Sequence, residues 1–307
     1  MTGSDVGTGE HLIAIVNPAA GGGRCGRMAP AAIDQLRSTG HQVSVYETRA
    51  PGDATRIARE KFAVGERHFV AVGGDGTGFE IVNGLFPEAL SVSDKPTLGF
   101  LPLGTGNSFL RDFSSEGASY ALDALKTGKR RPCDVVCLRH KEGALYFINI
   151  LSFGFLADVC SLTNRHFKGF GELGYPLGVI GTLARLAPRP IPYALDGGTF
   201  DERPLSFIII SNSRYTGGKM LISPLSDVAD GYADVIVAGK LGRRSVIGTF
   251  PKIFEGSHLG HPALTSGRAR AIEFKVDHPE DAMIDGEVIT VWPTRLEVLP
   301  LALEVRV

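Results

Sequence analysis

The sequence predicts an α/β domain followed by a mostly antiparallel β domain. Up to about residue 126, short apolar runs typical of buried strands alternate with amphipathic runs typical of helices, which indicates right-handed βαβ units and a parallel sheet. Beyond residue 132, short β-rich runs separated by turn residues dominate instead. We therefore expect one domain over residues 1–131 and a second over 132–299, with a final strand, about 300–307, that could return to the first.

The strands of the first domain are expected where apolar residues cluster, over 11–16, 43–47, 69–72 and 97–101. Helices are expected between them: one of about 15 residues ending near Gly40, one from Asp53 to about Ala63, one capped by Thr77 and one that ends near Lys126. In the second domain the expected strands cover 135–138, 145–151, 193–195, 205–211, 233–238, 271–276, 287–292 and 296–299, and the expected helices cover about 173–186 and 243–255.

Composition and charge narrow the function classes. The chain has 307 residues with 32 Lys and Arg against 33 Asp and Glu, and so balanced a charge argues against nucleic-acid binding. The four cysteines have no C-x-x-C spacing, which favours a reducing compartment. The polar residues 1–10 do not resemble a signal peptide, and the sequence has no uncharged apolar run of about 18 residues. We therefore expect a cytoplasmic protein without a nucleic-acid partner.

The stretch over 69–84 carries the strongest functional signal. Four apolar residues are followed by Gly73, Gly74 and Gly76, and Thr77 could cap the helix that comes next. Glycines leave backbone N–H groups uncovered, and a helix N-terminus adds positive potential, so a strand, a glycine turn and a helix in this order suit a phosphate. An ordinary tight βα turn is the alternative.

Asp75 is the unusual member of this turn. A carboxylate among phosphate-binding amides would repel the anion unless Mg²⁺ or a coordinated water lies between them. We therefore expect Mg²⁺, or a coordinated water, between Asp75 and the phosphate.

Two further glycine-rich turns follow strands, over 17–26 and 102–107. Because ligands of parallel sheets bind beyond the carboxyl ends of the strands, all three turns could converge on one site. The first turn also satisfies G-x-G-x-x-G, and Glu47 lies where a ribose-binding acid would sit. An NAD-dependent oxidoreductase is therefore an alternative, although it leaves the other two turns unexplained.

Six motifs in order resemble the diacylglycerol kinase catalytic-domain family, which includes bacterial soluble lipid kinases, sphingosine kinases and ceramide kinases. Four lie in the first domain: V-N-P-A-A-G over 16–21, Thr48 with G-D-A over 52–54, G-G-D-G-T over 73–77 with Glu80 and N-G over 83–84, and P-L-G-T-G-N over 102–107. Two lie in the second domain, over 223–234 and as I-D-G-E over 284–287.

The resemblance covers nearly the whole chain. It implies a Rossmann-like nucleotide-binding domain followed by an antiparallel β-sandwich domain, with ATP and lipid meeting in the cleft. The nucleotide contacts that it implies come from Asn17, Pro18, Gly21, Thr48, Gly73, Gly74, Asp75, Gly76, Thr77, Glu80, Gly104, Thr105 and Asn107.

Phosphoryl transfer also needs a base that takes the proton of the alcohol. Asp285 is followed by Gly286 between apolar residues, and by spacing alone a turn is a better explanation for it than a catalytic carboxylate. The resemblance reverses that order: it implies that Asp285 is the general base, supported by Asp134 and Lys168. A lysine nearby would keep the base ionised and oriented.

Some positions depart from the family's pattern. Gly78 and Phe79 replace the usual Leu-Asn, which puts a side-chain contact near the phosphates in doubt. Ser108 stands where most bacterial members have Asp. Leu225 stands where some bacterial relatives place a carboxylate that holds a structural Mg²⁺, so that metal site is not expected here.

Basic residues surround an apolar stripe between residues 240 and 254. Lys240, Arg243, Arg244 and Lys252 flank apolar side chains at helical spacing, which is typical either of a helix that caps the β domain or of one that contacts an anionic membrane surface. The segment over 177–186, with Arg185 and Arg189 at its end, is a second candidate for membrane contact.

We therefore expect an ATP-dependent lipid kinase that docks on the inner face of the membrane. Diacylglycerol is the first choice of acceptor, followed by a sphingoid base, ceramide or another glycerolipid. An NAD kinase, which shares the G-G-D-G turn, and a non-catalytic lipid-binding module remain alternatives. A homodimer is also compatible with the sequence.

Overall fold

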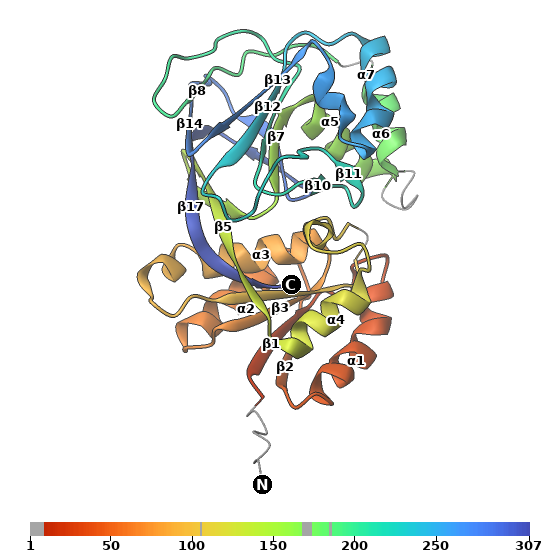
Figure 1. Ribbon diagram of the computed structural model, residues 1–307, viewed down its shortest axis with the longest axis vertical. Coiled ribbons are helices and arrows are strands. Elements are labelled where there is room, and N and C mark those ends of the chain that lie inside the picture. The colour runs from red at the N-terminus through yellow and green to blue at the C-terminus, as the bar shows by residue number, and fades with distance from the viewer. Residues whose placement is uncertain (1–8, 105, 168–173, 184–185) are drawn as a thin grey trace. The chain divides into compact units, whose positions relative to one another are not determined.

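The fold is that of a computed structural model, which describes residues 9–104, 106–167, 174–183 and 186–307. The chain divides into two compact units, Met1–Arg131 with Leu303–Val307, and Pro132–Ala302 (Figure 1). Strands β5 (Arg130–His140) and β17 (Pro293–Arg306) each have residues in both units. The predicted class is confirmed, because the first unit holds a parallel sheet and the second holds antiparallel strands.

Strands and helices alternate along the first unit. In chain order they are β1 (His11–Val16), α1 (Arg24–Arg37), β2 (Gln42–Glu47), α2 (Asp53–Ala63), β3 (His68–Gly73), α3 (Asp75–Leu85), β4 (Thr97–Pro102) and α4 (Ala118–Thr127). Short 3₁₀ helices at Glu88–Ser91 and Phe109–Asp112 follow α3 and precede α4. The sheet has the order β2-β1-β3-β4, and the end of β17 adds a parallel strand beside β4.

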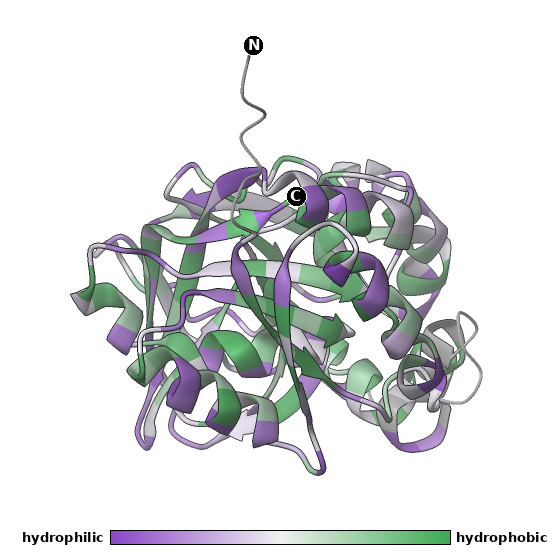
Figure 2. Ribbon diagram, turned by 90° about the horizontal axis from the view of Figure 1, so that it is seen from below, coloured by the Kyte–Doolittle hydropathy of each residue, from purple (hydrophilic) through white to green (hydrophobic). Residues whose placement is uncertain are grey.

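The core of the first unit follows the two-residue period of its strands. Leu12, Ala14 and Val16 alternate along β1 and share one core cluster with α1, to which Leu125 of α4 also belongs. Helices α2 and α3 pack closely where Gly84 lies, since a Cβ there would come within 2.4 Å of the Thr55 carbonyl oxygen. Figure 2 shows some strands coloured mainly as hydrophobic, and the helices as a mixture of hydrophobic and hydrophilic residues.

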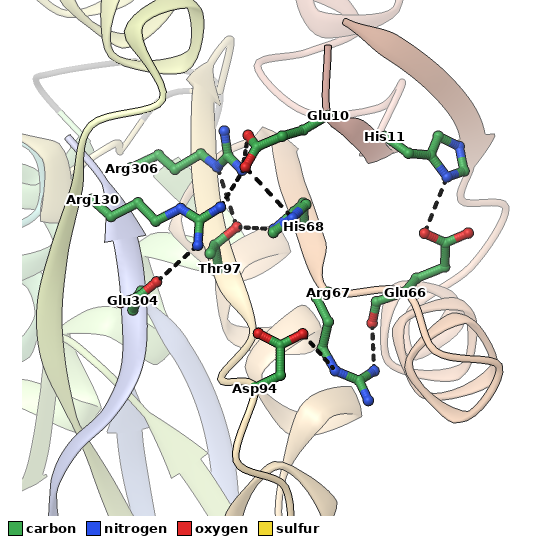
Figure 3. A network of polar contacts seen from close by, with 10 residues as sticks. All are labelled: Glu10, His11, Glu66, Arg67, His68, Asp94, Thr97, Arg130, Glu304 and Arg306. Carbon is green, nitrogen blue, oxygen red and sulfur yellow. Dashed lines mark hydrogen bonds and ion pairs between the residues drawn. The ribbon is translucent and has the colours of Figure 1, made fainter. Parts of the chain in front are cut away.

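A network of charged side chains around the buried Arg306 fastens the end of β17 to this unit (Figure 3). The Arg306 side chain is almost fully buried, pairs with Glu10 Oε2 at 2.6 Å and donates from Nε to Thr97 Oγ1 at 3.2 Å. Arg130 pairs with Glu10 and, at 3.3 Å, with Glu304. Burial lowers the pKa of Arg306. A buried guanidinium is costly without an anionic partner, so the pair with Glu10 fixes the position of this end of β17.

The second unit contains two sets of paired strands. In the first, β5 pairs with β6 (Gly143–Phe147) and with β17, and β17 pairs through β14 (Ala271–Phe274) with β8 (Tyr193–Leu195). The second is an antiparallel sheet of order β13-β12-β9-β7-β15-β16. Its strands are β7 (Ile150–Gly154), β9 (Phe207–Ser211), β12 (Ala233–Ala238), β13 (Leu264–Ala269), β15 (Glu280–Ile284) and β16 (Glu287–Val291).

Helices and a small hairpin complete this unit. The helices are α5 (Phe155–Leu162), which continues as a π turn over Thr163–Phe167, then α6 (Gly174–Thr182) and α7 (Arg243–Thr249), followed by 3₁₀ turns at Phe250–Phe254 and Ser257–Gly260. The hairpin joins β10 (Tyr215–Thr216) to β11 (Met220–Leu221). Apolar residues of α5, α7 and the strands share one core. No helix within the described ranges has the length and apolar character needed to cross a membrane.

Several predicted elements need correction. Helix α3 begins at Asp75 with Gly74 at its N-cap, so Thr77 lies within the first turn and does not cap the helix. The helix expected over 243–255 ends at Thr249, and a 3₁₀ helix with Pro251 in its first turn follows, because proline cannot donate to an α-helical ladder. Helix α5 and strands β13 and β15 were not expected.

Candidate active site

The three glycine-rich turns of the first unit come together at the carboxyl edge of its sheet. Asn17 donates its backbone N–H to the Val72 carbonyl at 2.9 Å, which ties the first turn to the end of β3. Gly104 donates to the Gly73 carbonyl at 2.7 Å, which joins the second and third turns. A Cβ on Gly104 would lie 2.6 Å from the Gly74 Cα, so only glycine permits this approach. The expected convergence is therefore present.

Thr77 presents a polar group without a partner at this edge. The residue is 4% exposed, and its hydroxyl has no hydrogen-bond partner among the described residues. A Cβ added to Gly73 would lie 2.4 Å from that hydroxyl. A buried donor beside glycine turns and the N-terminus of an 11-residue helix is the environment that a phosphate oxygen would complete.

Asp75 is bound by the protein itself. Ser108 donates its backbone N–H to both carboxylate oxygens at 2.9 Å, and Phe109 donates to Oδ1 at 3.5 Å. Burial raises the pKa of Asp75 against these hydrogen bonds. The carboxylate thus holds the segment after β4 in place, and its contact with Mg²⁺ stays a prediction. Nowhere in the described ranges do three His, Cys, Asp or Glu side chains gather as a metal site.

Other predicted nucleotide residues shape the turns from within. Glu80 accepts backbone N–H groups of Gly52 and Ala54, each at 3.0 Å, and so closes the N-terminus of α2. Asn107 has φ 52° and donates from Nδ2 to the Gly104 carbonyl at 3.1 Å. Thr105 lies outside the described residues.

The first turn and the end of β2 also meet this edge. Asn17 Oδ1 accepts the Ala19 N–H at 3.1 Å, Pro18 accepts from the Gly26 N–H at 3.2 Å, and Thr48 donates its N–H to the Val16 carbonyl at 2.8 Å. Gly21 has φ 61° and lies close to the third turn, because a Cβ on it would meet the Leu103 carbonyl oxygen at 3.0 Å. Gly73, Gly74 and Asp75 also line a small hollow, whose wall includes Phe100 and Phe109.

Asp285 in the second unit is both a turn residue and a placed carboxylate. Asp285 and Gly286 form the two-residue loop between β15 and β16, with φ 48° and 91°, as a type I′ hairpin requires. The residue is 3% exposed. Its Oδ1 accepts the Ile150 N–H at 2.8 Å and its Oδ2 accepts the Ile148 N–H at 3.4 Å. The hairpin therefore positions the carboxylate against the start of β7.

Asp134 is fully buried on β5 and holds two other segments. Its Oδ2 accepts the Gly231 N–H and its Oδ1 accepts the Leu301 N–H, both at 2.6 Å. Burial raises the pKa of this carboxyl, while the two hydrogen bonds oppose the change. Lys168, the other expected support of Asp285, lies outside the described residues.

Asn212 connects the surroundings of Asp134 and Asp285, and the sequence argument missed it. Its Nδ2 donates to the Ile148 carbonyl at 2.8 Å and to the Asp134 carbonyl at 3.2 Å. The available signal was a run of four polar residues over 211–214 that follows the apolar residues of β9, and such a run gives no indication of distant partners.

An apolar cavity lies in the second unit, and the empty space within it, part of which is open to solvent, is about 790 Å³. Its described wall includes Ile150 of β7, Met283 of β15 and Val246 of α7, and contains no Asp, Glu, Lys or Arg. His258 also lines it, is 3% exposed and has its pKa lowered by burial. The Ile150 N–H donates to the Asp285 carboxylate, so one residue of β7 contacts both the carboxylate and the cavity.

Comparisons with known proteins agree with this arrangement. Residues 11–138 match the family model described as diacylglycerol kinase catalytic domain, and residues 149–307 match the one described as YegS C-terminal NAD kinase beta sandwich-like domain. The chain is 29% identical over 298 residues to a Mycobacterium tuberculosis protein named diacylglycerol kinase, covering 96% of this chain and 94% of that one. It is 28% identical over 277 residues to a Bacillus subtilis protein of the same name, covering 89% and 88%.

The fold is also that of a solved structure. A putative diacylglycerol kinase from Bacillus anthracis superposes with a TM-score of 0.79 at 23% identity, covering 100% of this chain and 98% of that one. The two family models together span nearly the whole chain, and the second alone covers more than half of it. The chain belongs to the diacylglycerol kinase catalytic-domain family.

Proposed function

We propose that the protein is an ATP-dependent lipid kinase that transfers the γ-phosphoryl group to a lipid hydroxyl, with diacylglycerol as the acceptor. The observation that carries this proposal is the position of Ile150 on β7 in the second unit. Its N–H donates to the Asp285 carboxylate, and the same residue lines the apolar cavity. An acyl chain in that cavity would leave the polar end of the lipid beside the carboxylate.

The first unit would hold the phosphates of ATP. The glycine turns offer backbone N–H groups, and Thr77 offers a hydroxyl that lacks a protein partner within the described ranges. Mg²⁺ would bind mainly through the phosphates of the nucleotide, as it commonly does in kinases, with Asp75 as the nearby carboxylate. The ion would neutralise charge that develops on the phosphates.

Asp285 would act as the general base. The acceptor oxygen forms a bond to the γ-phosphorus, the bond from that phosphorus to the ADP oxygen breaks, and the hydroxyl proton passes to the Asp285 carboxylate. Asp134 would support this arrangement through the backbone segments that it holds, and Lys168 remains a proposed partner of the base.

The cavity favours a lipid over the alternatives. Its described wall has no charged Asp, Glu, Lys or Arg side chain, which suits an acyl chain and not the charged groups of NAD. The same apolar wall would also accept ceramide or a sphingoid chain, so diacylglycerol rests on the names of the curated relatives. An NAD-dependent oxidoreductase would leave the apolar cavity, and the glycine turns over 73–77 and 102–107, without a role.

Membrane contact would come from the segment around α7. Ile247 is 57% exposed and Phe254 is 45% exposed, and the basic side chains of Arg244 and Lys252 are exposed near them in the sequence. Exposed apolar side chains next to basic ones suit the interface of an anionic bilayer. Arg243 is partly committed within the protein, because its Nε donates to the Leu183 carbonyl at 3.0 Å.

In the second candidate for membrane contact, Arg189 is paired with Asp158, and Arg185 lies outside the described residues. Docking on the inner face of the membrane, and a homodimer, remain proposals.

The test is incubation with γ-labelled ATP and a panel of acceptors: diacylglycerol, ceramide, a sphingoid base and NAD. We expect the label to enter the lipid extract with diacylglycerol as the best acceptor. Label in NAD, or release of phosphate without any labelled lipid, would refute the proposal.

A further inference from the structure

We propose that Asn212 is a positioning residue for the proposed base Asp285. The inference rests on the proposed function, because it assigns Asn212 a part in the reaction that Asp285 is proposed to assist. Ile148, Asn149 and Ile150 form the segment that leads into β7, and β7 lies between β9 and β15 in the sheet.

One side of this segment holds the base. The N–H groups of Ile148 and Ile150 donate to the two oxygens of the Asp285 carboxylate, at 3.4 and 2.8 Å. The Asp285 N–H in turn donates to the Ile150 carbonyl at 2.9 Å. The position of the carboxylate therefore follows the position of the segment.

The other side of the segment is held by the end of β9. Asn212 donates its backbone N–H to the Asn149 carbonyl at 2.9 Å, and Ser213 donates to the same oxygen at 3.2 Å. The Asn212 side chain adds the contact from Nδ2 to the Ile148 carbonyl at 2.8 Å. With 0% exposure, Asn212 makes these contacts where no water competes for them.

Asparagine suits this position because one nitrogen carries two N–H donors. The second donor reaches the carbonyl of Asp134 at 3.2 Å, so Asn212 joins β5 to the segment that holds Asp285. The link expected between Asp134 and Asp285 thus includes a third residue. The Asn212 Oδ1 atom has no hydrogen-bond partner within the described ranges. The orientation that lets Nδ2 donate to both carbonyls therefore leaves the amide oxygen unpaired, which costs free energy.

The experiment measures kcat and KM for ATP and diacylglycerol with the full chain, for Asn212→Ala in the wild-type and in the Asp285→Asn background. A misplaced catalytic group costs about 10²-fold in rate, so we expect Asn212→Ala to lower kcat by roughly 10- to 100-fold in the wild type with both KM values nearly unchanged. In the Asp285→Asn background the same change should lower kcat by less than about threefold, because residues that act as a unit are not additive.

Two further variants keep the test decisive. Asn212→Ser retains one hydroxyl donor, should fold if Asn212→Ala does not, and should lose less activity. Thr294→Val removes a hydroxyl that donates to the Arg139 carbonyl at 3.0 Å, outside the contacts of Asp134, Asn212 and Asp285, and should keep wild-type turnover.

Folded Asn212 variants with wild-type kcat, or an equal loss in both backgrounds, would overturn the positioning role while the kinase proposal stands. A wild-type protein without lipid phosphorylation would overturn both proposals. An Asp285→Asn variant with full activity would overturn the roles of Asp285 and Asn212 and leave the kinase activity in place.

Discussion

Ile150 donates its backbone N–H to Asp285 Oδ1 at 2.8 Å while its side chain forms part of the apolar cavity wall. One residue thus joins the proposed base to the proposed lipid site. Because a strand in the middle of a sheet is among the most rigid parts of a fold, the base and the cavity keep a fixed relation within the second unit.

Thr77→Val should separate ligand binding from stability. Valine has nearly the shape of threonine but lacks the hydroxyl, which has no partner among the described residues. The free protein should be as stable as the wild type or more so, because a buried unpaired donor is removed. A hydrogen bond to a charged group contributes about 1.5–3 kcal/mol, so the Kd for ATP should rise by roughly tenfold or more.

Calorimetric titration and thermal unfolding check this prediction together. Thr127→Val is the matched control, because its hydroxyl donates to the Ala124 carbonyl at the end of α4, outside the glycine turns. Unchanged ATP affinity in Thr77→Val would remove the hydroxyl from the phosphate site.

Asp75→Asn should change how stability depends on pH. Burial raises the pKa of Asp75, so the folded chain holds this proton at a pH where the unfolded chain has lost it. The free energy of unfolding of the wild type should therefore fall, relative to Asp75→Asn, as the pH rises from about 4 through the raised pKa. Above that pKa the difference should be constant.

Urea unfolding at a series of pH values, without nucleotide or Mg²⁺, measures this difference. A difference that stays flat, or that grows in favour of the wild type with rising pH, would show that burial does not govern this carboxyl.

Charge reversal at Arg244 and Lys252 should weaken binding to anionic vesicles. Each basic residue near an anionic surface contributes about 1 kcal/mol, so reversing both should lower affinity by roughly 30-fold or more at low salt and by less at high salt. Arg243 is left unchanged, because it also donates to the Leu183 carbonyl.

Flotation with phosphatidylserine vesicles measures the effect, and charge reversal at Lys129, which precedes β5, is the control. Turnover on a short-chain, water-soluble diacylglycerol should stay at the wild-type level. If the variant with Arg244 and Lys252 reversed floats like the wild type and like the Lys129 control, the segment around α7 serves only to cover the β-sheet core.

The elements of the first unit could be predicted well from the sequence, because each strand, turn and helix of a βαβ unit has a recognisable local residue pattern. The strands over 11–16 and 69–72 and the glycine turns after them are all visible as short runs, and parallel strands bring such turns to one edge. The error at Thr77 was one of register: the extended backbone of Gly74, with φ −117° and ψ −171°, lets the helix begin at Asp75.

The second unit was harder to predict, since its pairings are distant in the chain. Helix α5 follows β7 directly within a mostly apolar stretch, where periodicity cannot tell a strand from a buried helix. Strand β15 begins with Glu280 and Asp281, and two adjacent acidic residues are more typical of a loop than of a strand. The contact of Asn212 with Ile148 spans 64 positions, and no local pattern predicts such a pair.

The central claim is that Asp285 takes the proton of a lipid hydroxyl during transfer from ATP. Asp285→Asn retains the size of the side chain and favours the same type I′ turn. Its single oxygen accepts only one of the N–H groups of Ile148 and Ile150, so stability should fall by about 1 kcal/mol. The affinity for ATP should be preserved, because the nucleotide is proposed to bind the glycine turns.

The most direct measurement is the single-turnover rate of label transfer from ATP to diacylglycerol by folded wild type and Asp285→Asn. We predict a rate about 10²–10⁴-fold lower in the variant at equal ATP affinity. Label transfer at the wild-type rate by the variant would contradict the account.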